Sequence, residues 1–190
     1  MKYQIIYADP PWKYGSRGAR SGRYKELPYK TMTIKELCAI PVNEIIDDNA
    51  ALFMWVTSPF LYDSQEVMKA WGFKYVRVDS VWAKAYESGA RRGVVSPWGM
   101  TDAEFILMGV KGSMCSNQES KSNQFTVVNA PVEGHSVKPK VFRTRIERRF
   151  GSLSKLEMFA RREVKGWDCI GNDIDGLDIK DSLQNILKKC

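Results

Sequence analysis

The residues Asp9-Pro10-Pro11-Trp12 are the part of this chain whose types and order could do chemistry. They follow the apolar run YQIIYA at residues 3–8, which is typical of a buried strand. Two consecutive prolines cannot continue a sheet ladder or lie within a helix, so the strand must end in a stiff turn. That turn holds one carboxylate close to one indole. It is either a rigid connection between elements or a small active site.

Methylation of an exocyclic amine on a nucleobase is a reaction that such a turn could perform. The lone pair of the amine nitrogen is delocalised into the ring, so the amine is a poor nucleophile. Two acceptors for its two N–H groups, the Asp9 carboxylate and the Pro10 carbonyl, would localise that lone pair. An indole stacked on the base contributes roughly 1–3 kcal/mol. Catalysis then consists of orientation and electrostatic stabilisation, and it needs no strong general base.

The composition favours a polyanionic partner. The chain has 190 residues and a net charge of +7, from 29 basic and 22 acidic side chains. This excess points first to nucleic acid. Four dispersed cysteines and a single histidine argue against a metal site and indicate free thiols in a reducing compartment. Neither a signal peptide nor a membrane span is expected, so the sequence predicts a cytoplasmic protein.

The pattern of apolar runs predicts an α/β fold. Strands are expected at 3–8, 50–57, 73–84, 103–110, 125–130, 156–160 and 166–171. Helices are expected at 34–40 after a capping box, at 42–46, between Ser58 and Gly72, at 140–150 and at 179–189. Residues 13–31 and 85–102 are predicted to be mobile loops. Helices on both faces of a mostly parallel sheet would place a ligand at the carboxyl ends of the strands, where the tetrad lies.

Further motifs occur together with the tetrad. They are ELPYKTM (26–32), VWAK (81–84), ILMGVKG (106–112), HSVKP (135–139), LEMFAR (156–161) and GND (171–173). In this order they resemble the MT-A70-like adenine-N(6) methyltransferases of the DPPW type, in a phage or bacterial branch. The resemblance implies one Rossmann-like domain over residues 1–190 that depends on S-adenosylmethionine. It also implies a three-layer sandwich with about seven strands, in a permuted beta-type order that places the catalytic strand first.

The resemblance assigns the substrate side of the site. Asp9 and the Pro10 carbonyl would hold the target amine, and Pro11 and Trp12 complete the catalytic set, with Trp12 stacked on the base. Tyr29 would close over the target, with core packing as the alternative. The VWAK motif places Trp82 in the adenine pocket, or else in the core, and adds Lys84 to the substrate-binding residues.

The resemblance also assigns the cofactor side. Lys138 would reach the methionine carboxylate, with Glu157 as its charge partner, or else is a solvated lysine at a helix start. Asp9, besides its catalytic role, is also expected among the cofactor-binding residues. The remaining cofactor contacts would come from Phe159, Arg161, Glu163, Asn172 and Asp173, where Glu163 replaces a histidine of the eukaryotic enzymes. His135 would shape the turn before Lys138.

Basic residues in the two expected loops would flank this pocket. They are Arg17, Arg20, Arg23, Arg91 and Arg92. They could clamp phosphates, or they could only keep the chain soluble. DNA is favoured over RNA, and sequence choice would come from the loops, from a homodimer or from a partner. The alternatives are an RNA adenine-N(6) methyltransferase, a non-catalytic nucleic-acid-binding subunit, and methylation of a protein or small molecule.

Overall fold

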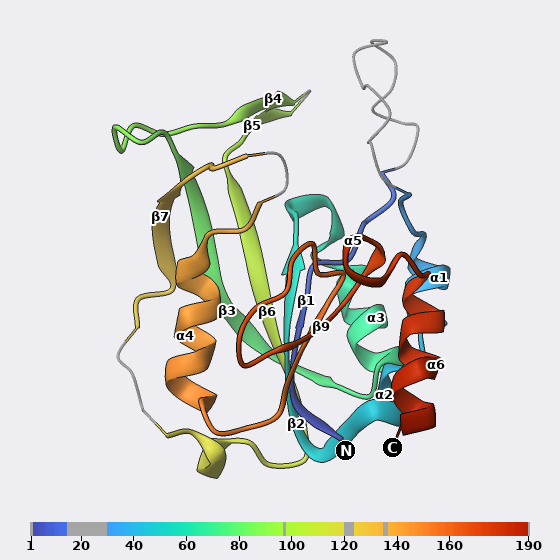
Figure 1. Cartoon of the computed structure of the whole chain (residues 1–190). Coiled ribbons are helices and arrows are strands. Elements are labelled where there is room, and N and C mark those ends of the chain that lie inside the picture. Colours follow the sequence, from blue (N-terminus) through green and yellow to red (C-terminus); the bar gives the residue numbers. More distant parts are fainter. Residues whose placement is uncertain (1, 15–29, 97, 120–123, 135–136, 190) are drawn as a thin grey trace.

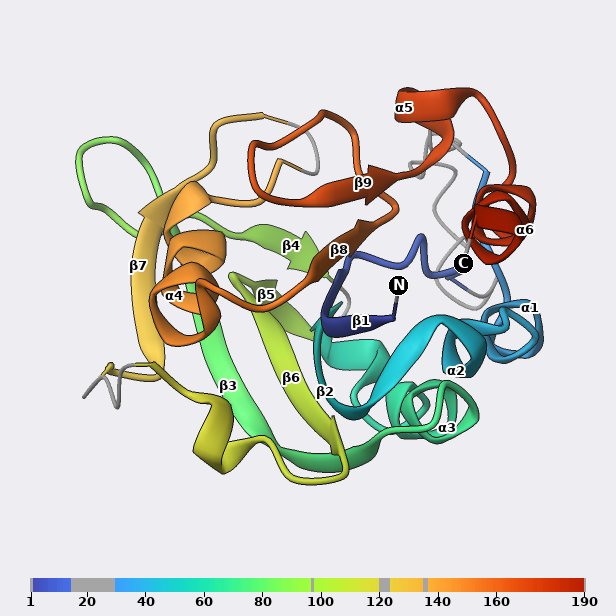
Figure 2. The same ribbon diagram turned by 60° about the horizontal axis from the view of Figure 1, so that its bottom comes forward.

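The computed structural model describes residues 2–14, 30–96, 98–119, 124–134 and 137–189. Its main sheet contains seven strands. They are β1 (Tyr3–Ala8), β2 (Ile46–Val56), β3 (Lys74–Ala85), β6 (Ala103–Lys111), β7 (Val127–Pro131), β8 (Lys155–Met158) and β9 (Asp168–Ile170). Their order across the sheet is β7-β3-β6-β2-β1-β8-β9 (Figures 1 and 2).

The sheet is mostly parallel, as predicted. The strand β1 pairs in parallel with both β2 and β8, β8 pairs in parallel with β9, and β3 with β7. The strand β6 alone among them runs antiparallel to its neighbours, β2 and β3. The first strand of the chain thus lies beside one of the last, as the permuted order predicts. The carboxyl ends of β2, β1, β8 and β9 therefore meet at one edge of the sheet.

Helices cover both faces of this sheet. One face carries α1 (Ile34–Cys38), α2 (Val42–Ile45), α3 (Ser64–Ala70) and α6 (Ile179–Lys189), and the other carries α4 (Lys140–Phe150) (Figures 1 and 2). Side chains alternate along a strand, so β1 contributes to two cores. Its Ile6 packs on the four-helix side, and its Ile5 and Tyr7 pack on the α4 side. Residues 50–56 of β2 are buried throughout, because both faces of this central strand are covered.

Several local predictions are confirmed. Thr33 and Glu36 form the capping box at the start of α1, with the Glu36 amide 3.2 Å from Thr33 Oγ1 and the Thr33 amide 2.7 Å from Glu36 Oε2. The C-terminal helix has the predicted limits, and Pro139 caps α4 as expected. Among the described residues, none of the helices combines the length and apolarity that crossing a bilayer requires.

Two predictions are wrong in detail. The helix expected after Ser58 starts as a short 3-10 turn, η2 (Ser58–Phe60), capped by Thr57, and α3 begins only at Ser64. The 85–102 segment is not an unstructured loop, because it contains a hairpin of β4 (Val94–Ser96) and β5 (Gly99–Thr101). Three-residue strands are too short for a periodic pattern to show. The other expected loop lies largely at positions 15–29, outside the described residues.

The packing of α4 on the sheet leads to a prediction about stability. Phe150 is fully buried, and its ring centroid lies 6.1 Å from that of Phe53 on β2. We expect Phe150→Ala to lower the free energy of unfolding by about 3–5 kcal/mol in urea titrations followed by circular dichroism. Phe125 is the matched control, because its residue is 84% exposed. Phe125→Ala should change the free energy of unfolding by less than about 0.5 kcal/mol. Similar losses in both variants would contradict this core.

Candidate active site

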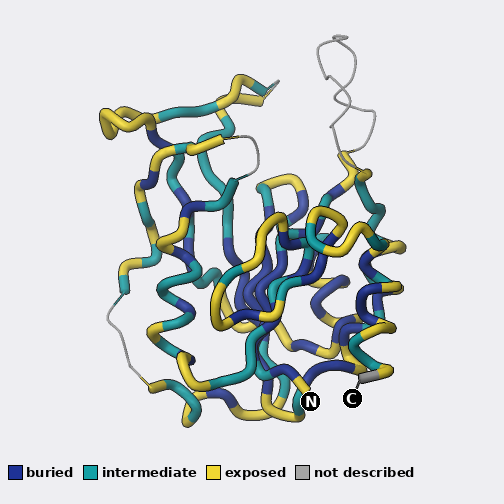
Figure 3. The backbone as a smooth tube through the Cα atoms, viewed as in Figure 1, coloured by how far each residue is buried: buried dark blue, intermediate teal, exposed yellow. Residues whose placement is uncertain are grey.

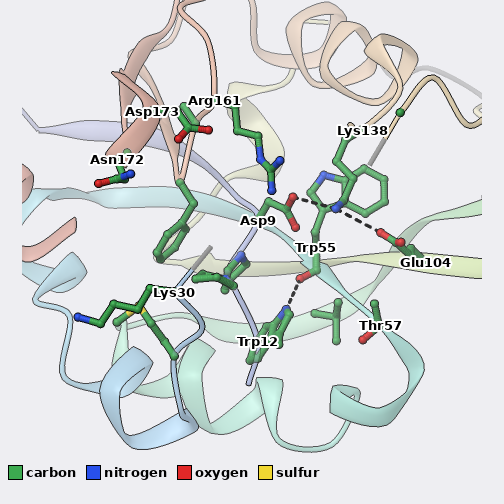
Figure 4. A pocket seen from close by; sticks show the side chains of 18 of the residues that line it. Asp9, Trp12, Lys30, Trp55, Thr57, Glu104, Lys138, Arg161, Asn172 and Asp173 are labelled. Carbon is green, nitrogen blue, oxygen red and sulfur yellow. Dashed lines mark hydrogen bonds and ion pairs between the residues drawn. The ribbon is translucent and has the colours of Figure 1, made fainter. Parts of the chain in front are cut away.

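A cavity of about 840 Å³ opens at the edge where the parallel strands end. Asp9 follows β1, Thr57 follows β2, Phe159 follows β8 and Gly171 follows β9, and all four line the cavity. Ligand sites commonly lie at the carboxyl ends of strands in such sheets. The volume is within the range of roughly 300–1,000 Å³ found for small-molecule sites. The structure therefore has a cavity at the place where the sequence predicted the site (Figure 4).

Backbone hydrogen bonds hold the tetrad rigid. The amide of Trp12 donates to the Pro10 carbonyl at 2.9 Å, and the amide of Met32 donates to the Pro11 carbonyl at 2.7 Å. The amide of Lys13 in turn donates to the Met32 carbonyl at 3.0 Å. A carbonyl oxygen has two lone pairs, so the Pro10 carbonyl keeps one for a further donor.

Trp12 lines the cavity and is also anchored in the core. Its indole Nε1 donates to the Trp55 carbonyl at 3.0 Å, and its residue is only 5% exposed. The Trp12 ring stacks on Phe60, with centroids 5.2 Å apart and planes 20° apart. One face of the indole is therefore covered by protein. The expected stacking on a base has to use the remaining face or edge.

Four charged side chains of alternating sign form a ladder along one wall of the cavity. Lys138 Nζ lies 2.8 Å from Asp9 Oδ2 and 3.3 Å from Glu104 Oε2, and Lys84 Nζ lies 2.6 Å from Glu104 Oε1. Figure 4 shows Lys138 between the two carboxylates. The ammonium group of Lys138 also lies 5.3 Å from the centroid of the Trp55 ring. The ladder joins strands β1, β3 and β6 to the segment before α4.

Contacts within the ladder shift the pKa values of its members. Burial disfavours the ionised form of Glu104, but the ammonium groups of Lys138 and Lys84 outweigh burial and lower the pKa of Glu104. Burial also disfavours the Lys138 cation, but the Asp9 and Glu104 carboxylates outweigh it and raise the pKa of Lys138. At Asp9 the balance differs, because burial outweighs the attraction of Lys138 and raises the pKa of Asp9. Asp9 is therefore the carboxylate of the pair that most easily takes up a proton.

Glu104 was not expected from the sequence. It lies on β6 in register with Trp82, inside the otherwise apolar segment AEFILMGV. A single acid at the start of an apolar strand is the signal that could have identified it. Its side chain is 13% exposed, so its charge depends on the two lysines.

The expected pairing of Glu157 with Lys138 is wrong. Both carboxylate oxygens of Glu157 accept from the Arg143 guanidinium of α4, at 2.7 Å for Oε1. Neighbouring Leu156 and Met158 pack on the four-helix side of the sheet, so the alternation along β8 turns Glu157 toward α4. Burial raises the pKa of Glu157, and Arg143 opposes that shift. Glu157 is not among the residues that line the cavity.

Trp82 is also placed differently from the expected adenine pocket. Its residue is 2% exposed, its Nε1 donates to the Ala130 carbonyl at 2.8 Å, and its ring meets Trp55 edge-on at 6.2 Å. It therefore packs in the core, as the alternative interpretation predicted. Lys84, two residues later, does line the cavity.

The opposite wall of the cavity carries four of the eight expected cofactor residues. Phe159, Arg161, Asn172 and Asp173 line it, and in Figure 4 Arg161 points toward Asp9 while Asn172 and Asp173 lie farther from it. Glu163 is exposed and does not line the cavity, so it does not lie where the expected contact with the cofactor would require it.

Gly171 allows the loops after β8 and β9 to pack closely in that wall. A Cβ on Gly171 would lie 2.6 Å from the Ala160 carbonyl oxygen, so no larger residue fits beside residues 159–160 without movement. Phe159 adopts a left-handed backbone conformation, with a φ of 61°. The close approach of these two loops brings their backbones to the edge of the cavity.

The expected phosphate-binding residues are only partly placed. Arg92 lines the cavity and donates to the Val132 carbonyl at 3.4 Å. Arg91 lies outside the cavity lining, with its guanidinium 4.0 Å from Asp102. Other expected residues fall outside the described residues: Arg17, Arg20, Arg23, Tyr29 and His135. Within the described ranges, no group of three His, Cys, Asp or Glu side chains is arranged to hold a metal ion.

The profile of the MT-A70 family matches residues 3–173, which is nearly the whole chain. The chain belongs to the MT-A70 family. Within this methyltransferase family, it is 32% identical to the type II methyltransferase M.MunI of Mycoplasma sp, over 91% of this chain and 78% of that protein.

Other relatives are longer proteins. The N(6)-adenosine-methyltransferase catalytic subunit METTL3 of Homo sapiens is 30% identical over 95% of this chain and 30% of its own length. METTL3 of Danio rerio is 31% identical over 95% of this chain and 29% of its own length. The chain thus spans most of M.MunI and under a third of either METTL3 protein.

The charge ladder leads to a second prediction. Glu104→Gln leaves Lys84 without its carboxylate, so we expect the free energy of unfolding at neutral pH to fall by about 3 kcal/mol. Because the pKa of Glu104 is lowered in the folded state, its stabilisation is present above the ordinary carboxyl pKa. That stabilisation is lost as the pH falls through the folded pKa, and the difference between wild type and variant should shrink there.

A double-mutant cycle measures the coupling. Adding Lys84→Met to Glu104→Gln removes the orphaned cation, so part of the lost stability should return. If the loss in the double variant equals the sum of the losses in Glu104→Gln and Lys84→Met, the result would contradict the ion pair.

Proposed function

We propose that this chain transfers a methyl group from S-adenosylmethionine to the 6-amino group of adenine in DNA. The observation that carries the proposal is the placement of Asp9. Its carboxylate lies in the cavity at the carboxyl end of β1, with Oδ2 bound to Lys138 at 2.8 Å, and Pro10, the next residue, also lines the cavity. A carboxylate and a backbone carbonyl from these two residues supply two acceptors for the two N–H groups of an aromatic amine.

The wall of the cavity formed by the loops after β8 and β9 fits the cofactor chemically. The Asp173 carboxylate and the Asn172 amide supply acceptors and a donor for ribose hydroxyls. Lys30, Arg161 and Lys138 supply cations for a carboxylate. The backbone at Gly171 leaves space that a Cβ would fill. When bound, S-adenosylmethionine supplies an electrophilic methyl group on a sulfonium.

The tetrad then prepares the amine for attack. Lys138 occupies Asp9 Oδ2, so Oδ1 is the oxygen that accepts one N–H of the amine. The second lone pair of the Pro10 carbonyl accepts the other N–H, because its first already accepts from Trp12. With both N–H groups held, the nitrogen lone pair turns out of the ring. The Asp9 anion stabilises the positive charge that grows on nitrogen.

The same carboxylate is the nearest acceptor for the proton that the amine loses after methylation. Burial raises the pKa of Asp9, which makes this proton transfer easier. Lys138 holds the carboxylate in place during both steps.

DNA is the favoured polymer. The chain matches the type II methyltransferase over most of both lengths, and it matches the METTL3 proteins over less than a third of theirs. The net charge of +7 and the basic residues near the cavity favour a polyanion over a protein or small molecule. We propose a single methyltransferase domain, active in the cytoplasm, with a homodimer as one expected assembly.

A transfer experiment tests this function. Purified protein is incubated with labelled S-adenosylmethionine and with duplex DNA, single-stranded DNA, RNA or free adenosine, followed by nucleoside mass spectrometry and methylation-sensitive sequencing. We expect N(6)-methyladenine in DNA, with the modified sites mapped. Asp9→Asn should reduce transfer at least 100-fold, roughly the contribution of a positioned acceptor, and leave cofactor affinity within about threefold. Transfer that survives in Asp9→Asn would contradict the role of Asp9, and label in RNA alone would contradict the polymer.

The ion pair predicts a pH dependence. Only ionised Asp9 can stabilise the growing positive charge and take up the amine's proton, so turnover at saturating cofactor should fall as the pH drops through its pKa, which lies above the ordinary 3.8. Lys138→Met removes the nearest cation, so the pKa of Asp9 should rise and the acid limb of the profile should move to higher pH. Lys138→Arg keeps the charge and should leave the limb near the wild-type position. A limb that stays fixed in Lys138→Met would contradict this coupling.

A further inference from the structure

The β4–β5 hairpin exposes apolar side chains beside the cavity. Trp98 is 99% exposed, and Val94, Val95 and Met100 are all more than half exposed. The hairpin projects beyond the carboxyl edge of the sheet in Figure 1, and its exposed arms are visible in Figure 3. Exposed apolar side chains that gather on one element in this way are typical of an interaction site.

The base of the hairpin is held firmly. Ala85 and Arg91 form a β-bridge, the Arg92 amide donates to the Lys84 carbonyl at 2.9 Å, and the Lys84 amide donates to the Asp102 carbonyl at 2.8 Å. These bonds continue β3 and β6 into the hairpin. The base of the hairpin therefore has a defined position relative to the ladder at Lys84.

The hairpin also starts at the cavity. Gly93 and Val94 line the cavity, and Trp98 is four residues farther along the chain. Residues 94–96 form strand β4, and Trp98 lies in the turn before β5. The exposed indole is therefore carried by the same hairpin whose start lines the cavity.

The charges around the hairpin suit a phosphate backbone. Arg91 at its base has a side chain that is 90% exposed, and Arg92 faces the cavity. The acidic groups nearby are Asp102, 4.0 Å from the Arg91 guanidinium, and Glu87 in the preceding turn, which is exposed. The Arg91–Asp102 pair is long and solvated, so Arg91 can turn to a phosphate at little cost.

We propose that Trp98 is a wedge that enters the base stack of duplex DNA next to the target adenine. This inference rests on the proposed function and extends it to the duplex form of the substrate. An adenine in a duplex has to leave the stack before Asp9 can reach its amine, which costs a few kcal/mol. Aromatic and apolar side chains that insert between base steps offset such unstacking. Trp98 stacks where the base has left, and Arg91 binds the adjacent phosphate.

A protein partner fits this hairpin less well. Stable protein interfaces involve roughly 20–30 residues on each side. Here the exposed apolar group consists of three side chains on two strands of three residues each, together with Trp98 in the turn between them. One exposed indole on a hairpin with arginines at its base is better matched to the gap between two bases.

The test compares two duplexes that carry the site mapped in the transfer experiment. In one the target adenine is paired with thymine, and in the other it faces an abasic position and is already unpaired. We expect Trp98→Ala to lower kcat/KM on the paired duplex about tenfold or more, within the range for loss of one stacking contact. On the unpaired duplex the loss should stay below about threefold. Trp98→Phe should retain most of the activity on both.

Phe125→Ala is the control, because it removes another exposed aromatic side chain away from the cavity. It should leave both rates unchanged. Equal losses by Trp98→Ala on both duplexes, or unchanged kinetics, would overturn the wedge. A lower sedimentation mass of Trp98→Ala with unchanged kinetics would assign the hairpin to a contact between protein chains and would also overturn it.

The failure of this inference is distinguishable from the failure of the proposed function. Wild-type protein that methylates the duplex as fast as Trp98→Ala does would refute the wedge alone. Wild-type protein that transfers no methyl group to any nucleic acid would refute both.

Discussion

The ion pair between Asp9 and Lys138 is the contact on which the site depends. These two residues are 129 positions apart, and their side chains meet at 2.8 Å. The pair holds the segment before α4 against the end of β1, and it sets the orientation of the carboxylate in the cavity. Burial of Asp9 without this cation would favour its neutral acid form, which is a weaker acceptor for an amine N–H and cannot take up a proton. Glu104 and Lys84 extend the pair into a ladder that keeps Lys138 charged.

The sheet determines how such contacts can form. Because side chains alternate along a strand, each strand divides its residues between two environments. On β8, Leu156 and Met158 enter the core beneath the four helices, whereas Glu157 binds Arg143 of α4. The same guanidinium lies 5.8 Å from the ring of Tyr7. The Glu157–Arg143 pair thus joins β8 to α4 and does not line the cavity. The charged side chains at the carboxyl edge of the sheet line the cavity, where a ligand can reach them.

Different elements form the two sides of the cavity. Loops after β8 and β9 form the wall expected to hold the cofactor, and the tight contact at Gly171 fixes their spacing. The ends of β1 and β2 bring the tetrad and Thr57, and β3 and β6 bring the ladder and the hairpin. In the proposed function, nucleic acid approaches from this second side. The sheet would then carry the reacting groups, and the elements at its edge would contact the larger substrate.

Much of this protein could be predicted from its sequence. The Asp-Pro-Pro-Trp turn, the capping box at Thr33 and the strand and helix segments follow from local rules about proline, caps and apolar periodicity, and the structure contains them. The ordered motifs identified the family, whose profile covers residues 3–173. Those features depend on neighbours within a few positions, so the sequence determined them by itself.

The tertiary structure decided which charges and aromatic rings meet. Lys138 pairs with Asp9 and Glu104 and not with Glu157, Trp82 fills the core and not the cavity, and the 85–102 segment folds into a hairpin. Each outcome depends on the face of a strand or on residues distant in the chain. Periodicity shows that a strand has two faces, but only the packing of helices on the sheet decides which face is which. That is the physical reason why the site could be located from the sequence and its internal pairing could not.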